Sequence, residues 1–561
     1  MPNLVTIYCK NTKQFVQIPC GTSLLELYQQ LNLQLPYPVI AARVNYKVQS
    51  LNFLIYKPKD IEFIDATSES GHRCYVRTLS MVMACAVHEL WPDCDLRIEH
   101  PISKGFYCTI RQSRTDTKVI TPEVVQQLKS RMQTIIEENR PVITEERQTK
   151  EVIRLFSDRN DGETTLFETL GNPYCRYYRI GEYIDYYTGA LMPSTGYINL
   201  FDVELYYDNI LLRIPSRKDP NSLEKRCVQD KRFGIFKEYI GWNKLLHISN
   251  VGEFNKACKN QKSFEMIKLS EALHEKKVAQ IADQIAHREG GIPKFVLISG
   301  PSSSGKTTSA NRLATQLRVH GKKPILMSLD DYYLDRDKIP TEADGSVDLE
   351  HINTIDTELF AEQLGQLLAG EEVEIPTFNF KKGQREWVGH HMRLCEDTVI
   401  IVEGLHALNP VLLPEKLDKN KVFKMYVSPL LPLNLDDHNR IASRYLRLLR
   451  RIVRDFETRG ATVQKTLSMW DSVRRGEERW IFPFQENADV IFNSSTLYEL
   501  AVLKRHIFPL LRVIGPEDDC YDQVRAIVKI LNYIYEADVD DEIPPTSIVR
   551  EFIGGNSFYR A

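Results

Sequence analysis

One segment of this 561-residue chain has residues spaced for holding a polyphosphate. Residues 300–307 read GPSSSGKT and fit the pattern G-x-x-x-x-G-K-[ST]. Glycines let such a loop turn its backbone N–H groups toward one anion, and the start of a following helix adds partial positive charge. A plain glycine–serine turn is the alternative. The predicted phosphate contacts are Gly300, Ser302, Ser303, Ser304, Gly305, Lys306, Thr307 and Thr308.

The other groups that phosphoryl transfer needs are carboxylates near the metal ion and the acceptor. Asp330 follows the apolar run PILMSL and is the candidate general base. Glu403 follows TVIIV and is placed to hold Mg²⁺ through water, together with the hydroxyl of Thr307. The structural alternatives are a helix N-cap for Asp330 and an ordinary strand-end acid for Glu403.

The stretch 440–459 carries seven arginines and is expected to be helical. Four of them recur at i, i+3, i+4 and i+7 and so share one helix face, namely Arg447, Arg450, Arg451 and Arg454. Their charges repel one another unless anions approach, and a lid that closes on a triphosphate would bring those anions. A solvated basic face and a nucleic-acid contact are the alternatives.

The elements that must position these residues alternate between short apolar runs and longer helical segments from residue 292 to about 515. Five runs read as strands buried on both faces of a parallel sheet, at residues 294–300, 324–330, 398–404, 422–428 and 488–494. This pattern predicts a doubly wound α/β domain. Ligands bind such sheets at the carboxyl ends of the strands, where the loop, Asp330 and Glu403 all fall.

The remaining chain divides into four further segments. Residues 1–66 predict a small β-rich domain, with a hairpin from LVTIY and FVQIP and a helix at 21–31 capped by Thr22 or Ser23. Residues 67–215 predict an α+β domain. Residues 216–290 are read as a basic linker and a lead-in helix, residues 291–515 as the α/β domain, and residues 516–561 as a helical C-terminal extension.

Composition bounds the class of protein. The net charge is −3, so no global field draws the chain to nucleic acid or to an anionic membrane. The 11 cysteines form no CxxC pair, which is typical of reduced thiols. We find no pattern of a signal peptide, and no apolar run approaches the ~20 residues of a membrane span. The expected protein is therefore cytoplasmic and has no membrane segment.

Residues 292–515 resemble the uridine kinase and phosphoribulokinase group of P-loop kinases. The matching pieces, in order, are GPSSSGKTT, SLDDYY, LEHINTID, IPTFNFKKGQRE, VEGLHAL, RYLRLLRRIVRDFETRG and ENADVIFN. The resemblance implies ATP and Mg²⁺ as cofactors and Asp330 as the catalytic aspartate, with Lys306 and the lid residues Arg447, Arg450 and Arg454. It implies substrate contacts from Glu350, His351, Phe378 and Arg385, with Glu350 where uridine kinases have an aspartate that holds ribose hydroxyls.

Three positions depart from uridine kinases. Phe378 replaces a tyrosine, Gly383 a histidine and Met469 a glutamine, so three polar contacts to the base are lost together. A site without such groups loses its discrimination. The resemblance therefore implies transfer of the γ-phosphate to a hydroxyl, with the 5′-hydroxyl of a nucleoside as the expected acceptor, but it does not carry pyrimidine specificity.

The front half resembles two modules of threonyl-tRNA synthetase. Residues 1–66 look like a TGS domain, a ubiquitin-like β-grasp fold. Residues 67–215 are similar to the editing domain, through ACAVHELWP, KGFY and EYIDYYTG. The four catalytic positions of that domain fall on Met81, Cys85, Tyr187 and Leu191, none of them histidine. The resemblance therefore implies a binding or regulatory module without editing chemistry.

Two other functions stay open. One is a nucleotide-switched regulatory protein that binds tRNA or other RNA through its front half, with the basic segment 216–232 as a contact. The other is a phosphoribulokinase-like kinase of a non-nucleoside acceptor, against which the carboxylate of Glu350 argues because it would repel a sugar phosphate. The expected partner is a small nucleoside-like molecule, and an oligomer is left open.

Overall fold

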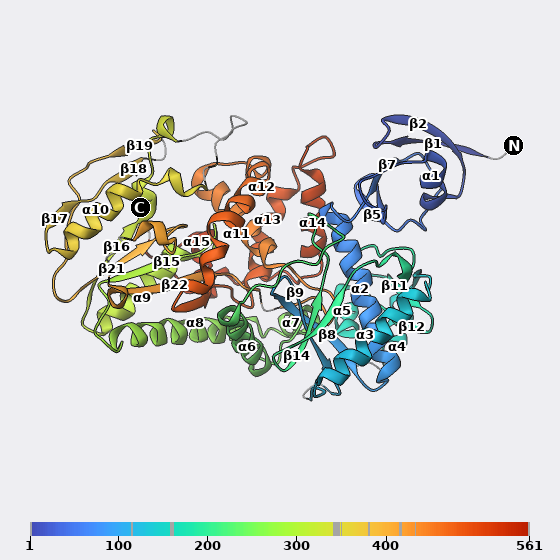
Figure 1. Ribbon diagram of the computed structural model, residues 1–561, viewed down its shortest axis with the longest axis horizontal. Coiled ribbons are helices and arrows are strands. Elements are labelled where there is room, and N and C mark those ends of the chain that lie inside the picture. Colours follow the sequence, from blue (N-terminus) through green and yellow to red (C-terminus); the bar gives the residue numbers. More distant parts are fainter. Residues whose placement is uncertain are drawn as a thin grey trace. The chain divides into compact units, whose positions relative to one another are not determined.

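The computed structural model describes residues 3–113, 116–157, 162–339, 348, 350–379, 382–413, 418–431 and 433–558. The chain forms two compact units (Figure 1). Unit 1 comprises Met1–Gln229, His247–Lys256 and Leu433–Ile441, and unit 2 comprises Asp230–Leu246, Ala257–Pro432 and Ala442–Ala561. None of the described helices combines the length and apolarity of a membrane span. The finer domain boundaries expected from the sequence remain predictions.

Unit 1 begins with a five-stranded sheet of order β2-β1-β7-β4-β5. The predicted hairpin is present as antiparallel strands β1 (Leu4–Cys9) and β2 (Gln14–Pro19). The predicted helix is α1 (Leu24–Leu31), and Ser23 is its cap, because the Ser23 hydroxyl accepts from Glu26 N while the Glu26 carboxylate accepts from Ser23 N. The other elements here are β3 (Thr22–Ser23), β4 (Ala41–Val44), β5 (Lys47–Gln49), β6 (Leu54–Ile55) and β7 (Asp60–Ile64).

The rest of unit 1 is built around the long helix α2 (Glu69–Leu90), whose central residues are buried. It shares a core with a four-stranded sheet of order β13-β14-β9-β8 and a three-stranded sheet of order β10-β11-β12. The strands are β8 (Asp95–Ile102), β9 (Gly105–Arg111), β10 (Ile143–Gln148), β11 (Tyr174–Ile180), β12 (Tyr183–Asp185), β13 (Asp202–Tyr206) and β14 (Asn209–Arg213). The further helices are α3 (Pro122–Glu137), α4 (Thr149–Leu155) and α5 (Glu163–Leu170).

Residues 433–441 belong to unit 1, although the chain on both sides of them belongs to unit 2. The imidazole of His438 fixes this segment. Its Nδ1 lies 3.0 Å from Oδ1 of Asp185 and 3.6 Å from Oε1 of Glu163, and its Nε2 lies 3.0 Å from the carbonyl oxygen of Leu96. Burial lowers the pKa of His438, but the two carboxylates outweigh it and raise this pKa well above its ordinary value.

Unit 2 contains the parallel sheet that the sequence predicts, in the order β16-β21-β15-β22-β23. Its strands are β15 (Phe295–Ser299), β16 (Lys323–Ser328), β21 (Thr398–Glu403), β22 (Val422–Ser428) and β23 (Val490–Asn493). Phe295 and Leu297 point into a core shared with helices α6 (Asp230–Leu245) and α10 (Thr357–Leu368). Helix α9 (Lys306–Val319) packs on β15, β16 and β21, beside α8 (Ser263–Ala286).

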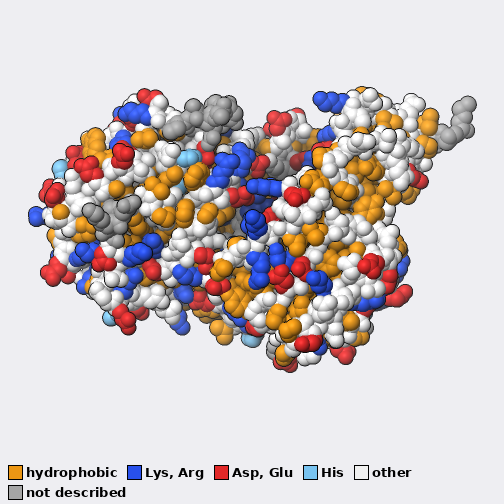
Figure 2. Space-filling model, viewed as in Figure 1, with side chains coloured by type: hydrophobic (Ala, Val, Ile, Leu, Met, Phe, Trp, Pro, Cys, Tyr) orange, Lys and Arg blue, Asp and Glu red, His pale blue; other side chains and the backbone are white. Residues whose placement is uncertain are grey.

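Smaller elements complete unit 2. The short strands are β17 (Glu372–Glu374), β18 (Thr377–Asn379), β19 (Gln384–Glu386) and β20 (His391–Arg393). The helices of the C-terminal part are α11 (Ser443–Arg459), α12 (Val463–Trp480), α13 (Glu499–Leu511), α14 (Tyr521–Leu531) and α15 (Arg550–Ile553), while α7 (Val251–Lys259) begins in unit 1. On the visible face of the molecule, Lys and Arg side chains gather near the middle of the view, whereas acidic and basic side chains are mixed elsewhere (Figure 2).

The His438 cluster gives a stability prediction. We expect His438→Gln to lower the free energy of unfolding by about 3 kcal/mol near pH 6, because two buried carboxylates lose their cationic partner. Since the folded-state pKa is raised, this contribution is fully present below the unfolded pKa of ~6.5 and is lost as the pH rises through the folded-state value. Urea unfolding of the full chain measures it. The exposed His247, changed to Asn, is the matched control; equal losses for both variants would contradict the prediction.

Candidate active site

The phosphate loop, residues 300–307, connects strand β15 to helix α9. Ser303 has a φ of +58° and Gly305 a φ of +83°, so both adopt the left-handed conformation that lets successive N–H groups converge. A Cβ at Gly300 would lie 2.0 Å from the carbonyl oxygen of Val427, so this position requires glycine. The strand–loop–helix arrangement predicted from the G-x-x-x-x-G-K-[ST] pattern is therefore present.

Oxygen donors meet beside the start of α9. The Thr307 hydroxyl donates to Oε1 of Glu403 at 3.2 Å, which joins the end of strand β21 to the phosphate loop. Hard divalent cations take oxygen ligands, and Mg²⁺ usually binds one or two carboxylates together with substrate phosphates. The donor set at Thr307 and Glu403 fits Mg²⁺ on these grounds.

Three partly buried acids lie within electrostatic reach of Lys306. Burial raises the pKa of Asp330, while the positive charge of Lys306 works in the opposite direction. Burial and the nearby Asp330 carboxylate raise the pKa of Glu403 to about 7. Burial and the Glu477 carboxylate raise the pKa of Glu350 to about 7. Acids with perturbed pKa values within electrostatic reach of one lysine are typical of a functional site.

The predicted substrate residues Glu350 and His351 lie against helix α12. A Cβ at Gly476 would lie 2.3 Å from Cβ of Glu350, so the helix and Glu350 are in close contact. The ring of His351 packs on Trp480 with a centroid separation of 4.2 Å, and its Nδ1 accepts from the backbone N–H of Asn353. His351 thus has structural contacts, whereas the Glu350 carboxylate is in electrostatic reach of Lys306 and Asp330.

The other two predicted substrate residues come from the β18–β19 hairpin. Phe378 lies edge-on to Tyr333, with 5.6 Å between ring centroids. The guanidinium of Arg385 donates to Oδ2 of Asp356 at 2.9 Å. A Cβ at Gly383 would lie 2.5 Å from Cδ of Arg336. Arg336, which the sequence interpretation did not single out, therefore fills the space that a side chain at position 383 would take.

The arginines of the predicted lid are balanced by the protein's own carboxylates. Helix α11 starts at Ser443, so the expectation that Arg440 lies on it is wrong; Arg440 precedes the helix and belongs to unit 1. Arg447 pairs with Glu477, and its Nε donates to the carbonyl oxygen of Ser302 at 3.0 Å. Arg451 pairs with Asp455 at 3.2 Å, and Arg454 pairs with the same carboxylate at 2.9 Å.

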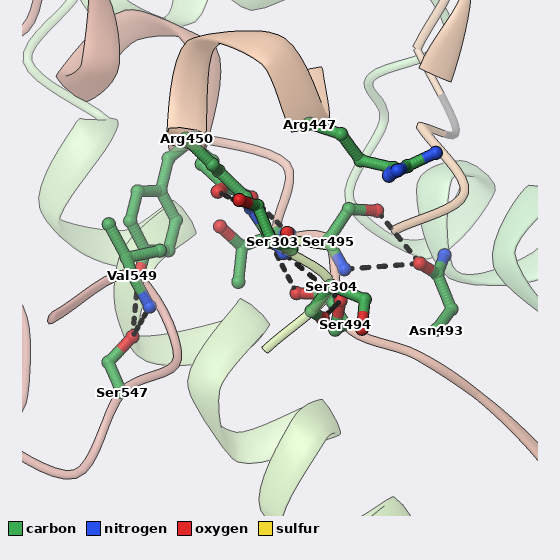
Figure 3. A network of polar contacts seen from close by, with 12 residues as sticks. Ser303, Ser304, Arg447, Arg450, Asn493, Ser494, Ser495, Ser547 and Val549 are labelled. Carbon is green, nitrogen blue, oxygen red and sulfur yellow. Dashed lines mark hydrogen bonds and ion pairs between the residues drawn. The ribbon is translucent and has the colours of Figure 1, made fainter. Parts of the chain in front are cut away.

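Arg450 is fully buried and is held from several sides. Its Nη2 donates to Oε2 of Glu499 and to the carbonyl oxygen of Ser494, both at 2.8 Å, and its Nη1 donates to the carbonyl oxygen of Ser303 at 3.4 Å. Figure 3 shows Arg450 reaching toward Ser303 and Ser494, whereas the guanidinium of Arg447 points away from them. Arg450 therefore holds the outside of the phosphate loop to the chain that follows β23.

Two acids at the phosphate loop were missed by the sequence interpretation. The backbone N–H of Ser302 donates to Oε1 of Glu477 at 2.9 Å. The backbone N–H of Thr308 donates to Oε2 of Glu551 at 3.2 Å. Both acids are distant in sequence from the loop and belong to no spacing pattern, so only the tertiary structure reveals them.

In unit 1 the four positions that the sequence resemblance assigns to editing residues lie in a hydrophobic core. Met81, Cys85 and Leu191 are fully buried, and Tyr187 is 4% exposed. Burial raises the pKa of the Cys85 thiol to about 12, so this thiol stays protonated. These side chains pack rather than present reactive groups.

Comparison with known proteins gives two separate matches, one for each half of the chain. The N-terminal region matches a protein named threonine–tRNA ligase from Syntrophomonas wolfei, 30% identical over 202 residues. These are 36% of this chain and 31% of the ligase, so the chain spans about a third of the ligase's length.

The C-terminal match is to kinases. Residues 295–501 match the profile described as phosphoribulokinase / uridine kinase family. A uridine kinase from Ligilactobacillus salivarius is 31% identical over 208 residues, which are 37% of this chain and 87% of that protein. A uridine kinase from Vibrio atlanticus is 30% identical over 223 residues, 39% of this chain and 96% of that protein. Since nearly the whole length of these kinases is matched, the chain belongs to the phosphoribulokinase/uridine kinase family.

Proposed function

We propose that this protein is a kinase that transfers the γ-phosphoryl group of ATP to a hydroxyl of a small nucleoside-like acceptor, with Mg²⁺ as cofactor. The observation that carries the proposal is the placement of Lys306, Glu403 and Asp330. Lys306 and Asp330 follow β15 and β16, and Glu403 is the last residue of β21. These are three neighbouring strands of one parallel sheet, and the residues lie at the carboxyl ends where such sheets bind ligands.

The residues divide the work of phosphoryl transfer, which is mostly positioning and charge neutralisation. The loop N–H groups and Lys306 would hold the phosphates, and Thr307 with Glu403 would hold the metal ion. When bound, Mg²⁺ neutralises charge that develops on the phosphate oxygens. Asp330 would orient the acceptor hydroxyl and take its proton, and its raised pKa brings it closer to the working pH of a general base.

The acceptor side favours a neutral, hydroxylated molecule. The Glu350 carboxylate can accept hydrogen bonds from sugar hydroxyls and would repel a phosphorylated sugar. Phe378 offers an apolar ring edge in place of a polar base contact, and Arg336 takes the space next to Gly383. The proposal that the acceptor is a nucleoside therefore depends on Glu350. The residues named here do not select a particular nucleobase.

For unit 1 we propose a TGS-like β-grasp module followed by an editing-like module that binds without hydrolysing. The match to a threonine–tRNA ligase supports the origin of both modules, and the packed core at Met81, Cys85 and Leu191 supports the loss of chemistry. A nucleotide-switched RNA-binding protein is the second candidate function, favoured by the same match.

Replacing the proposed base tests the enzyme assignment. We expect Asp330→Asn to lower kcat by ~10²–10⁴-fold and to leave ATP binding intact, because a positioned base contributes about that much to a proton transfer. ADP release by the full chain, measured with each common nucleoside in turn, reports both the rate and the acceptor. The exposed Asp337, changed to Asn, is the control. An unchanged rate in Asp330→Asn would remove Asp330 from this role.

Titration of Glu350 tests the acceptor site. Its pKa of about 7 means that it becomes a full carboxylate, the better acceptor of hydrogen bonds, only above neutrality. We expect the KM of the acceptor to fall by up to about tenfold as the pH rises from ~6 to ~8. The charged groups that set this pKa, besides Glu350 itself, are Glu477, Arg451, Lys306 and Asp330. In Glu350→Gln this slope in KM should vanish; a slope that persists would contradict the assignment.

The RNA-binding candidate predicts that tRNA binding depends strongly on the salt concentration. Binding through phosphate neutralisation would retain tRNA at ~20 mM salt and release it by ~200 mM. Electrophoretic mobility of tRNA with the full chain measures this, with and without neutral substitutions of the basic residues of segment 216–232. Absence of any shift at low salt would discard the RNA-binding candidate and leave the kinase proposal untouched.

A further inference from the structure

The start of helix α9 is occupied by a carboxylate from the far end of the chain. Oε2 of Glu551 accepts from the backbone N–H of Thr308 at 3.2 Å and from the Thr308 hydroxyl at 2.6 Å. The side-chain amide of Asn556 donates to the same hydroxyl at 3.1 Å. Both residues lie in the C-terminal segment, residues 547–557, outside the part of the chain that matches the kinase family.

The backbone of the C-terminal segment is firmly anchored. Ile548, Val549 and Phe552 are 0–1% exposed, and the Ser547 hydroxyl donates to Oε1 of Glu271 at 2.8 Å. The guanidinium of Arg450 lies 4.7 Å from the ring centroid of Phe552. Figure 3 shows Ser547 and Val549 on the same side of the phosphate loop as Arg450.

The C-terminal segment also touches the phosphate loop itself. A Cβ at Gly305 would lie 2.6 Å from Cγ2 of Ile548. The loop and the segment are therefore in close contact. Rotation of the Glu551 side chain alone would take its carboxylate away from Thr308 and leave the anchored backbone in place. The anchored backbone thus keeps Glu551 near Thr308, while the Glu551–Thr308 hydrogen bonds depend on the conformation of one side chain.

The donor that Glu551 takes is one that a nucleotide needs. The first N–H groups of a helix have no partner within the helix, and those of a phosphate loop cradle the α- and β-phosphates. A carboxylate at the Thr308 N–H satisfies this donor and is stabilised by the positive end of the helix. A phosphate oxygen cannot use the same donor at the same time and is repelled by the carboxylate.

We propose that Glu551 is an internal competitor of ATP, so that its carboxylate occupies part of the phosphate site and must be displaced when the nucleotide binds. The inference rests on the proposed function, because it assumes that the loop binds ATP. Only the molecules in which the Glu551 carboxylate has left the site can bind ATP. The apparent Kd for ATP therefore equals the Kd of the open site divided by the fraction of molecules in which the site is open. The position of the Glu551 carboxylate thereby sets the ATP concentration at which the site is half-filled.

The electrostatics around the site agree with this inference. The negative charge of Glu551 is one of the influences that raise the pKa of Glu403, after burial and the Asp330 carboxylate. Glu551 thus adds a negative charge to a place where the phosphates of ATP bring several more. Removal of this charge relieves the repulsion on the incoming nucleotide.

The test is calorimetric titration of the full chain with ATP and Mg²⁺, and separately with adenosine. We expect Glu551→Gln to bind ATP about tenfold more tightly than the unaltered protein, which corresponds to a site free in one molecule of ten before the change. Glutamine keeps a carbonyl oxygen for Thr308 and removes only the charge. Adenosine affinity should stay unchanged, because adenosine has no phosphate. The exposed Glu542, changed to Gln, is the matched control and should leave both affinities unchanged.

Each outcome is decisive. If the unaltered protein binds ATP and Glu551→Gln binds it equally well or more weakly, Glu551 is no competitor and the inference is overturned while the proposed function stands. If neither protein binds ATP, the proposed function fails together with the inference. Tighter binding of both ATP and adenosine points to a general change of the site and also overturns the inference. Thermal melts by circular dichroism verify that the variants are folded, and Glu551→Ala should repeat the gain for ATP.

Discussion

The start of helix α9 is the electrostatic centre on which unit 2 depends. It presents backbone N–H groups without partners in the helix, the positive end of the helix dipole and the ammonium of Lys306. Such a concentration of donors needs anions. One backbone donor of the preceding loop and one of the helix have carboxylate partners from the protein, Glu477 at Ser302 and Glu551 at Thr308. The same two acids act on their neighbours: after burial, which is the largest cause in both cases, Glu477 raises the pKa of Glu350 and Glu551 contributes to the raised pKa of Glu403.

The same balance explains the arginine-rich helix α11. A buried guanidinium is costly unless it is paired and hydrogen-bonded. Arg450 meets both conditions through Glu499, Ser494 and Ser303. Arg447 meets them through Glu477 and Ser302. These arginines thus support the outer wall of the phosphate loop, and only a rearrangement of their pairs would turn them toward a phosphate. The carboxylates Glu477 and Glu499 therefore help to hold the conformation of the phosphate loop, through Arg447 and Arg450.

Local patterns were enough to predict the parallel sheet, the phosphate loop and the capped helix α1, because each depends on residues close together in sequence. The five apolar runs predicted buried strands. Gly305 supplies the left-handed backbone that the loop pattern indicated, and Gly300 allows the close approach of the Val427 carbonyl. Hydrogen bonds between residues far apart in sequence could not be predicted from any local pattern. The partners of Ser302 and Thr308 lie 175 and 243 positions away. His438 was read with the kinase half because of its neighbours in sequence, yet its charge is matched by acids of unit 1.

The core of unit 1 contains the four positions that the sequence resemblance assigns to editing residues. Hydrolysis needs a polarised water molecule and a group to take its proton, and both require polar side chains that reach solvent. At the four corresponding positions the chain instead has side chains that are 0–4% exposed, among them a thiol whose pKa of about 12 keeps it neutral. Burying such groups adds apolar contacts and removes the cost of desolvating a catalytic histidine. Under the origin proposed for unit 1, the stability of this core and the absence of editing chemistry therefore have one physical cause.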